Sequence, residues 1–175
     1  MKNAAKTVSD LGCLAGAARN IPVTGLAVDS RAVRPGYLFA ALPGLQVHGA
    51  DYISAALALG ATSILTDAAG VRRARSTLDG AKGICVWISE DPRQALAAAA
   101  ALWFGAQPDT MVAVTGTNGK TSVASFVRQI WTEMGHSAIN LGTNGVLGAW
   151  QAPLTHTTPE PITLHDTLSR AQAAG

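Results

Sequence analysis

In the first half of the chain, short apolar runs lie on both sides of a segment with helical periodicity. The segment over residues 52–59 has apolar positions at helical spacing and is followed by Gly60, a helix-ending residue. Four apolar runs have the length of strands, at residues 23–28, 37–41, 62–65 and 84–88. Strands that alternate with helices are typical of an α/β layer structure, so the pattern predicts an α/β fold.

A longer helix is predicted to begin at Pro92. Asp91 is placed to cap it, and Gln94 stands at the position that completes a capping box. This helix is expected to run to about Phe104 and to end at Gly105. Because the pattern changes just before it, we predict a domain boundary near residues 89–91.

The second half of the chain shows a strand, a loop and a helix in sequence. Residues 111–114 are a short apolar run suited to a buried parallel strand, and the polar loop 115–119 follows. Apolar residues then recur at helical spacing over 123–134 up to Gly135, and residues 137–141 resemble another strand. The predicted unit is β–loop–α–β, with the loop at the carboxyl end of a strand, where open α/β sheets bind ligands.

The loop ends in Gly119-Lys120-Thr121, directly at the start of the predicted helix. Triphosphate oxygens bind converging backbone N–H groups, and glycine lets the backbone approach closely. The helix N-terminus adds free donors and the positive end of a dipole. Lys120 supplies a cation for the outer phosphates, and the Thr121 hydroxyl is a ligand for Mg²⁺. The sequence therefore predicts a phosphate-binding loop for a nucleotide.

Position 114 departs from the general phosphate-binding pattern G-x-x-x-x-G-K-[ST]. Its first glycine would fall at this position, where the chain has valine. A P-loop kinase or GTPase should have that glycine, so Val114 argues against both classes. The alternative of an ordinary glycine-rich turn does not explain Lys120, because a cation at a helix start opposes the dipole unless an anion is bound.

Composition and charge narrow the class of protein. The chain of 175 residues is 48% apolar and 14% charged, with a net charge of +2. It has no run of about 18 apolar residues and no apolar leader segment, so we expect neither a transmembrane helix nor a secretory signal. Arg72, Arg73 and Arg75 lack interleaved aromatics and indicate a solvated loop rather than a nucleic-acid surface. Cys13 and Cys85 match no metal or redox spacing and are expected to be buried thiols in a reducing cytoplasm.

Three stretches carry a resemblance to a known family. The string 115–121, Thr-Gly-Thr-Asn-Gly-Lys-Thr, resembles the ATP loop of the Mur ligase family, which replaces the first glycine in this way. Asp29-Ser30-Arg31, with Val33, Pro35-Gly36 and Leu38-Phe39, resembles the N-terminal signature of its MurE and MurF branches. Residues 156–160, His-Thr-Thr-Pro-Glu, resemble a stretch typical of the MurE branch. Together they follow the order of the family over nearly the whole chain.

The resemblance implies a domain division and a set of binding residues. It implies a small N-terminal α/β domain for a uridine nucleotide (1–89), then the beginning of a P-loop-type parallel-sheet ATPase domain (90–175), without the C-terminal amino-acid-binding domain. The implied ATP-binding residues are Gly116, Thr117, Asn118, Gly119, Lys120, Thr121 and Ser122, with Lys120 catalytic and Thr121 a ligand of Mg²⁺. The implied substrate-binding residues are Val28, Ser30, Leu45, Gln46, Val47, His156, Thr157 and Thr158.

Some of these positions have plainer interpretations, and two depart from the family pattern. From the residues alone, Ser30 would cap a turn and Gln46 would only be exposed. Tyr37 and His48 stand where aspartate is usual, and neither is predicted to be catalytic. A capping-box-like pair, Thr163 and Asp166, predicts a helix over 164–173 whose first turn holds His165, expected to be an exposed surface residue rather than a ligand.

The resemblance implies an ATP-dependent amide ligase of peptidoglycan synthesis in the cytoplasm. ATP and Mg²⁺ would be its cofactors, and a UDP-N-acetylmuramoyl dipeptide and a diamino acid its substrates, with no nucleic-acid or membrane partner. The added amino acid, lysine or diaminopimelate, and the oligomeric state stay open. We expect this portion to bind without ligating. The alternatives are a MurF-like ligase, which the Thr-Thr-Pro stretch fits poorly, and a non-catalytic nucleotide-binding module.

Overall fold

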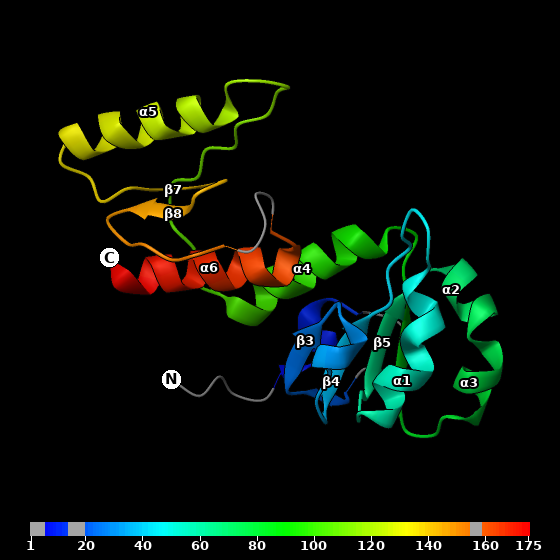
Figure 1. Ribbon diagram of the computed structural model, residues 1–175. Coiled ribbons are helices and arrows are strands. Elements are labelled where there is room, and N and C mark those ends of the chain that lie inside the picture. Colours follow the sequence, from blue (N-terminus) through cyan, green and yellow to red (C-terminus); the bar gives the residue numbers. More distant parts are fainter. Residues whose placement is uncertain (1–5, 14–19, 155–158) are drawn as a thin grey trace. The chain divides into compact units, whose positions relative to one another are not determined.

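The computed structural model describes residues 6–13, 20–154 and 159–175 (Figure 1). The chain divides into two compact units, Met1–Trp103 and Phe104–Gly175. His156, Thr157 and Thr158 lie outside the described residues. Each unit is described by itself below.

A four-stranded parallel sheet forms the centre of the first unit. Its order follows the chain: β3 (Gly25–Ala27), β4 (Tyr37–Ala40), β5 (Ser63–Thr66) and β6 (Cys85–Ile88). In its register Leu38 lies beside Ser63, which in turn lies beside Cys85. Beside this sheet, β1 (Lys6–Thr7) and β2 (Pro22–Val23) form a small antiparallel pair. Since all four central strands are parallel, their carboxyl ends meet at one edge.

Helical segments connect or follow the strands of this unit. They are η1 (Ser9–Leu11), η2 (Ser30–Ala32), η3 (Gly49–Tyr52), α1 (Ile53–Ala58), α2 (Ala68–Arg73), α3 (Arg75–Gly80) and α4 (Pro92–Phe104). Phe39 and Ile64 of the sheet pack with Ile53 and Ala56 of α1 in one buried cluster. Leu38 and Leu65 alternate with them and point to the opposite face, so the sheet is buried on both sides.

The helix α4 belongs to the first unit. Its Leu96, Ala99 and Ala100 are fully buried, and Lys6 Nζ donates to the carbonyls of Leu102 and Trp103. The compact units therefore divide after Trp103, whereas the sequence pattern placed a boundary before this helix, because the apolar face of α4 packs within the first unit.

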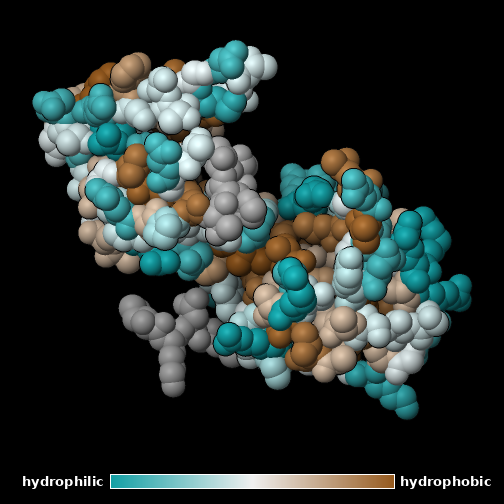
Figure 2. Space-filling view, in the orientation of Figure 1, coloured by the Kyte–Doolittle hydropathy of each residue, from teal (hydrophilic) through white to brown (hydrophobic). Residues whose placement is uncertain are grey.

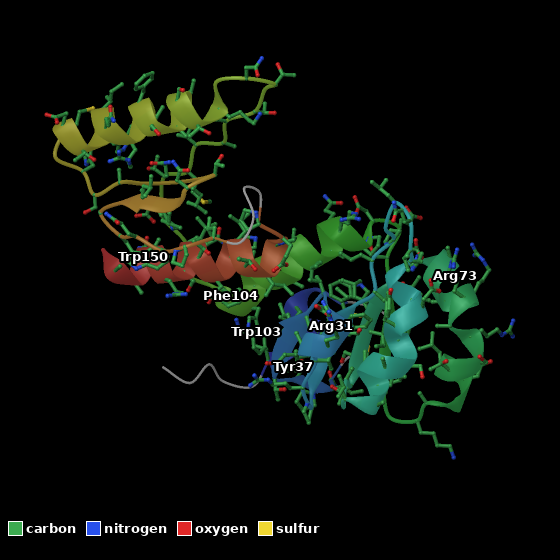
Figure 3. All side chains as sticks on the ribbon, in the orientation of Figure 1. Arg31, Tyr37, Arg73, Trp103, Phe104 and Trp150 are labelled. Carbon is green, nitrogen blue, oxygen red and sulfur yellow. The ribbon has the colours of Figure 1, made fainter. Side chains whose placement is uncertain are left out.

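The described residues of the second unit form two helices and a hairpin. They are α5 (Lys120–Glu133), the antiparallel strands β7 (Ile139–Gly142) and β8 (Gly145–Gly148), and α6 (Pro161–Ala174). Arg128 Nε of α5 donates to Asn140 Oδ1 of β7 at 2.9 Å. The guanidinium of Arg170 in α6 lies 5.2 Å from the ring centroid of Trp150 (Figure 3). The first contact holds β7 against α5, and the second joins α6 to the segment after β8.

Most elements expected from the sequence are confirmed. The α/β class and the parallel sheet are present, and α4 begins at Pro92 as predicted. Its cap is also confirmed, because Asp91 Oδ1 accepts from the amides of Arg93 at 3.1 Å and Gln94 at 3.0 Å. The predicted strand 23–28 is divided into β2 and β3. Gly135, with a φ of +86°, follows α5 directly, as expected.

The predicted strand at residues 111–114 is wrong. These residues form no strand, and the side chains of Met111 and Val112 are 57% and 58% exposed. A buried parallel strand needs a neighbour on its sheet, and β7 instead pairs with β8 in an antiparallel hairpin. No parallel β–loop–α–β unit therefore forms within the described part of the second unit.

Two expectations about α6 are also corrected. Glu160, not Thr163, caps the helix, because its carboxylate accepts from the amides of Ile162 at 2.7 Å and Thr163 at 2.8 Å. His165 is half-buried rather than exposed. Burial lowers the pKa of His165, and its Nδ1 has no hydrogen-bond partner.

Candidate functional site

Two glycines shape the loop before α5. Gly116 has a φ of +139° and Gly119 a φ of +79°, both in the region that disfavours other residues. Gly119 is the N-cap of α5, and no side chain makes a capping hydrogen bond there. The first turn of the helix also contains no acidic residue. The amides at the start of this helix of 14 residues are therefore available to an anion.

Lys120 folds back over the loop. Its Nζ donates to the carbonyl of Gly116 and, at 3.3 Å, to that of Thr117. These carbonyls compensate a cation that would otherwise oppose the positive end of the helix dipole. Thr121 and Ser122 follow in the first turn, and both side chains are exposed. The ammonium, hydroxyls and amides thus lie together, as a phosphate site requires.

The loop opens onto a cavity within the second unit. The cavity has a volume of about 1440 Å³, and it is lined by residues of the loop, of segment 107–114, and of α5, β7 and α6. A Cβ added at Gly119 would meet nothing within 4 Å, so the space next to the helix start is open. The residues present therefore fit a triphosphate with its Mg²⁺, with Thr121 placed to supply a hydroxyl ligand.

A second candidate region lies at the carboxyl edge of the parallel sheet in the first unit. Val28, Asp29 and Ser30 follow β3 there. Asp29 caps η2, accepting from the Arg31 amide at 2.9 Å, and also pairs with the Arg31 guanidinium at 2.7 Å. The Arg31 hydrogen bonds lower the pKa of Asp29 to about 2. The capping role expected as the plain alternative for Ser30 thus belongs to Asp29.

The neighbouring strand β4 leads into an exposed loop at the same edge, residues 44–47. Its ends meet in an antiparallel bridge between Pro43 and His48. Leu45 is fully exposed and Val47 is 48% exposed, so apolar surface projects into solvent at the tip. Figure 2 shows hydrophobic side chains at the surface of both units. A Cβ at Gly44 would collide with the Val47 carbonyl, which explains glycine at this turn.

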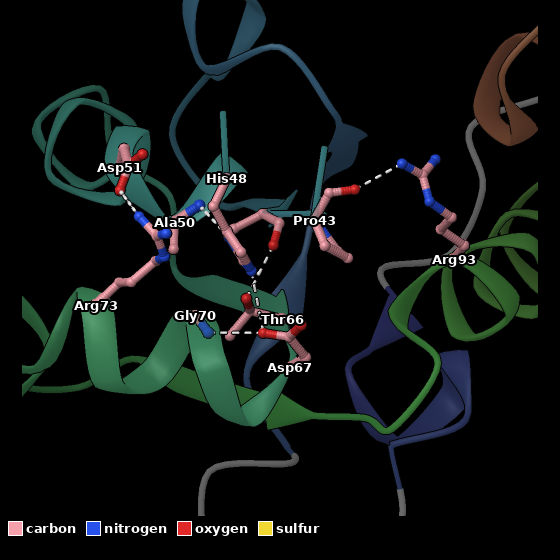
Figure 4. Close-up of polar contacts among 10 residues, drawn as sticks. Pro43, His48, Ala50, Asp51, Thr66, Asp67, Gly70, Arg73 and Arg93 are labelled. Carbon is pink, nitrogen blue, oxygen red and sulfur yellow. Dashed lines mark hydrogen bonds and ion pairs between the residues drawn. The ribbon is translucent and has the colours of Figure 1, made fainter. Parts of the chain in front are cut away.

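Residues that the sequence reasoning missed hold the base of this loop (Figure 4). His48 Nε2 lies 3.1 Å from Asp67 Oδ1, and Arg93 Nη2 donates to the Pro43 carbonyl at 2.6 Å. The pKa of Asp67 is lowered, first by the hydrogen bond from the Gly70 amide and then by His48. Asp67 was recognisable as a helix N-cap between a strand and a helix, but nothing in the sequence paired it with His48.

The other residues singled out from the sequence are the remaining nucleotide-binding candidates, the arginine cluster and the two cysteines. The predicted nucleotide residues fall into two groups, with Val28, Ser30 and 45–47 at the sheet edge of the first unit and 116–122 in the second. Arg73 is paired with Asp51 at 3.5 Å and Arg75 with Asp79 at 3.5 Å. These arginines are exposed as expected, but they lie in the helices α2 and α3 rather than in a loop. Both cysteines are buried, and burial raises the pKa of Cys85 to about 11.

No described helix is both long and apolar enough to cross a membrane.

The fold and the loop together define an α/β protein with a glycine-shaped loop at a helix start, whose amides and lysine fit an anion. Comparison with protein families identifies it further. Residues 22–104 match the model described as Mur ligase family, catalytic domain, and residues 114–175 match the Mur ligase middle domain. The chain belongs to the Mur ligase family.

Similar curated proteins are named UDP-N-acetylmuramoyl-L-alanyl-D-glutamate--2,6-diaminopimelate ligase. The protein of Brucella melitensis is 44% identical over 161 residues, covering 91% of this chain and 32% of the relative. That of Bradyrhizobium diazoefficiens is 46% identical over 156 residues, covering 89% and 30%. The chain therefore spans about a third of the length of these relatives.

A solved structure supports the fold. It carries the same enzyme name and is 24% identical, with a TM-score of 0.76, covering 98% of this chain and 34% of that one. At this identity the match establishes the fold alone.

Proposed function

We propose that the chain is the N-terminal portion of an ATP-dependent ligase that adds a diamino acid to UDP-N-acetylmuramoyl-L-alanyl-D-glutamate. The observation that carries the proposal is the uncapped start of α5, where Lys120 and two positive-φ glycines form a phosphate loop. The names of relatives at 44% and 46% identity support the substrate, and they favour 2,6-diaminopimelate as the added amino acid. These substrates are cytoplasmic metabolites, so the proposal includes a cytoplasmic location.

The phosphate loop would hold ATP and its metal. Residues 116–122 would bind the phosphates through their amides and hydroxyls, and Lys120 would exchange its present carbonyl partners for phosphate oxygens. Thr121 would supply a hydroxyl ligand to Mg²⁺, which neutralises charge on the outer phosphates.

The proposed reaction activates a carboxylate. The γ-phosphoryl group of ATP moves to the free carboxylate of D-glutamate, which gives an acyl phosphate. The amine of the diamino acid then attacks the acyl carbon, and phosphate leaves as the amide forms. Phosphoryl transfer depends mainly on positioning and on charge stabilisation. Lys120, the loop amides and a metal held by Thr121 would provide much of both, and no nucleophilic side chain is needed.

The first unit would hold the uridine nucleotide of the substrate. Val28 and Ser30 follow β3, and the loop 44–47 follows β4, at the edge of a parallel sheet where ligands bind. The exposed Leu45 and Val47 would gain contact with the base or ribose on binding. By the family resemblance, His156, Thr157 and Thr158 would contact the same substrate.

A second candidate for this chain is a nucleotide-binding module that does not ligate. The exposed side chains of α5 favour this second candidate, because no residue of this helix is buried within the second unit. Phosphate release with ATP, the UDP-muramoyl dipeptide and 2,6-diaminopimelate separates the two candidates. Amide chemical shifts supply the binding test. The UDP ligand should perturb the amide shifts of residues 28–31 and 45–47, and ATP should perturb those of residues 116–122. If ATP alone perturbed the first set, the proposed roles of the two units would be wrong.

A further inference from the structure

The loop 44–47 is fixed at its base rather than at its tip. Its ends meet through the bridge between Pro43 and His48 and, beside it, through the Gly49 amide, which donates to the Leu42 carbonyl at 2.8 Å. Leu45 at the tip is fully exposed. An exposed tip makes few contacts that could select one conformation. The conformation of the loop therefore depends on how Pro43 and His48 are held.

Both ring nitrogens of His48 are engaged. Nδ1 accepts from the Ala50 amide at 3.0 Å and so caps η3. A neutral imidazole with an accepting Nδ1 carries its proton on Nε2, so Nε2 donates to Asp67 Oδ1 at 3.1 Å. Only 10% of the His48 side chain is exposed. The ring thus joins the end of the loop to the turn between β5 and α2.

The partners of the loop are themselves fixed. Asp67 caps α2 by accepting from the Gly70 amide at 2.6 Å. The neighbouring Thr66 is fully buried and donates to the Ala41 carbonyl, just after β4, at 2.8 Å. At the other end of the loop, Arg93 of α4 donates to the Pro43 carbonyl. Elements that follow β5 and β6 therefore hold both ends of a loop that follows β4.

We propose that His48, Asp67 and Arg93 are positioning residues that set the conformation of the loop 44–47, the proposed binding loop for the uridine nucleotide. The inference rests on the proposed function of residues 45–47. These three residues act through the loop: a preformed loop presents Leu45, Gln46 and Val47 without the entropy cost of ordering them on binding. Releasing either end should weaken binding of the uridine nucleotide and leave ATP binding unchanged.

Three variants of the described chain test the two hydrogen bonds of His48 and the one from Arg93, with uridine diphosphate as the probe. His48→Ala removes both bonds, and His48→Gln keeps an N–H that reaches Asp67. Arg93→Ala changes an exposed side chain, so it does not threaten folding. We expect UDP to bind about tenfold more weakly to His48→Ala, and His48→Gln to recover most of the affinity. Arg73→Ala, which removes the exposed pair with Asp51, is the matched control and should bind as wild type.

The methyl chemical shifts of Leu45 and Val47 provide a second readout that needs no ligand. They should move in His48→Ala and Arg93→Ala and stay in place in Arg73→Ala. Wild-type UDP affinity together with unchanged methyl shifts in His48→Ala and Arg93→Ala would overturn the inference. An equal loss of affinity in Arg73→Ala would also overturn it, by showing a general loss of stability. Failure of the wild-type chain to bind UDP would instead refute the proposed function, while the methyl shifts still decide whether these residues position the loop.

Discussion

The carboxylate of Asp29 and the guanidinium of Arg31 form a bidentate pair two residues apart, at the carboxyl end of β3. Arg31 Nη2 lies 2.7 Å from Asp29 Oδ2, and Nε lies 3.0 Å from Oδ1. The Arg31 amide also donates to Oδ1 at 2.9 Å. Ser30, a proposed contact of the uridine nucleotide, lies between the two residues, so this pair fixes the turn that presents it.

The pair predicts an unusual titration of Asp29. Its pKa should be about 2 in the folded chain rather than the ordinary 3.8, because the hydrogen bonds from the Arg31 side chain and amide favour the charged form. A lowered folded pKa means that the contribution to stability is present above pH 3.8 and is lost as the pH falls towards 2. Carboxyl chemical shifts of Asp29 against pH measure this. Arg31→Ala should return the pKa towards 3.8, whereas Arg34→Ala should leave it unchanged.

Lys120→Ala should remove most of the affinity for ATP. A charged hydrogen bond to phosphate contributes about 1.5–3 kcal/mol, so affinity should fall roughly tenfold to hundredfold. The free energy of unfolding should change by less than about 1 kcal/mol, because an exposed cation at a helix N-terminus contributes little stability. Titration calorimetry with ATP and thermal unfolding measure the two effects. Lys82→Ala, at an exposed lysine of the first unit, is the control, and equal ATP affinity in both variants would contradict the loop assignment.

Gly44→Ala should weaken binding of the UDP ligand without unfolding the chain. The added Cβ would collide with the Val47 carbonyl, so the loop must open, whereas surface changes of this kind alter stability by only about 0.5 kcal/mol. Gly80→Ala is a matched control, since its Cβ would meet nothing within 4 Å. UDP titrations and melting temperatures of both variants test the prediction. Undiminished affinity in Gly44→Ala would show that the shape of this loop does not matter for the ligand.

The two units should differ in amide hydrogen exchange. Residues 23–88 should exchange slowly, because their sheet is buried on both faces. Residues 111–141 should exchange fast, because α5 has no buried residue and segment 111–114 has no strand partner. We also expect no ADP above background from this chain with both co-substrates. ADP release that depends on both co-substrates, or strong protection over 111–141, would contradict this prediction.

The sequence alone determined the features that depend on interactions between residues close together in the chain. The cap of α4 follows from Asp91, whose carboxylate bonds amides two and three residues away. The turn before α5 is likewise encoded in consecutive residues, since Gly116, Gly119 and Lys120 are positioned by a turn and the first turn of one helix. Such interactions close within a few residues, so the pattern of residue types is enough to predict them.

Only the tertiary structure decided which distant residues meet. An apolar run at 111–114 looked like a strand, but it pairs with no strand among the described residues of the second unit, and Met111 and Val112 remain exposed. His48 meets Asp67 across 19 residues, and Arg93 meets Pro43 across 50. The parallel sheet creates the His48–Asp67 contact, because it brings the carboxyl ends of β4 and β5 to one edge, and packing of α4 on the same unit brings in Arg93. Residue types indicate that a carboxylate or an imidazole can form a hydrogen bond, but the partner is selected by the order of the strands.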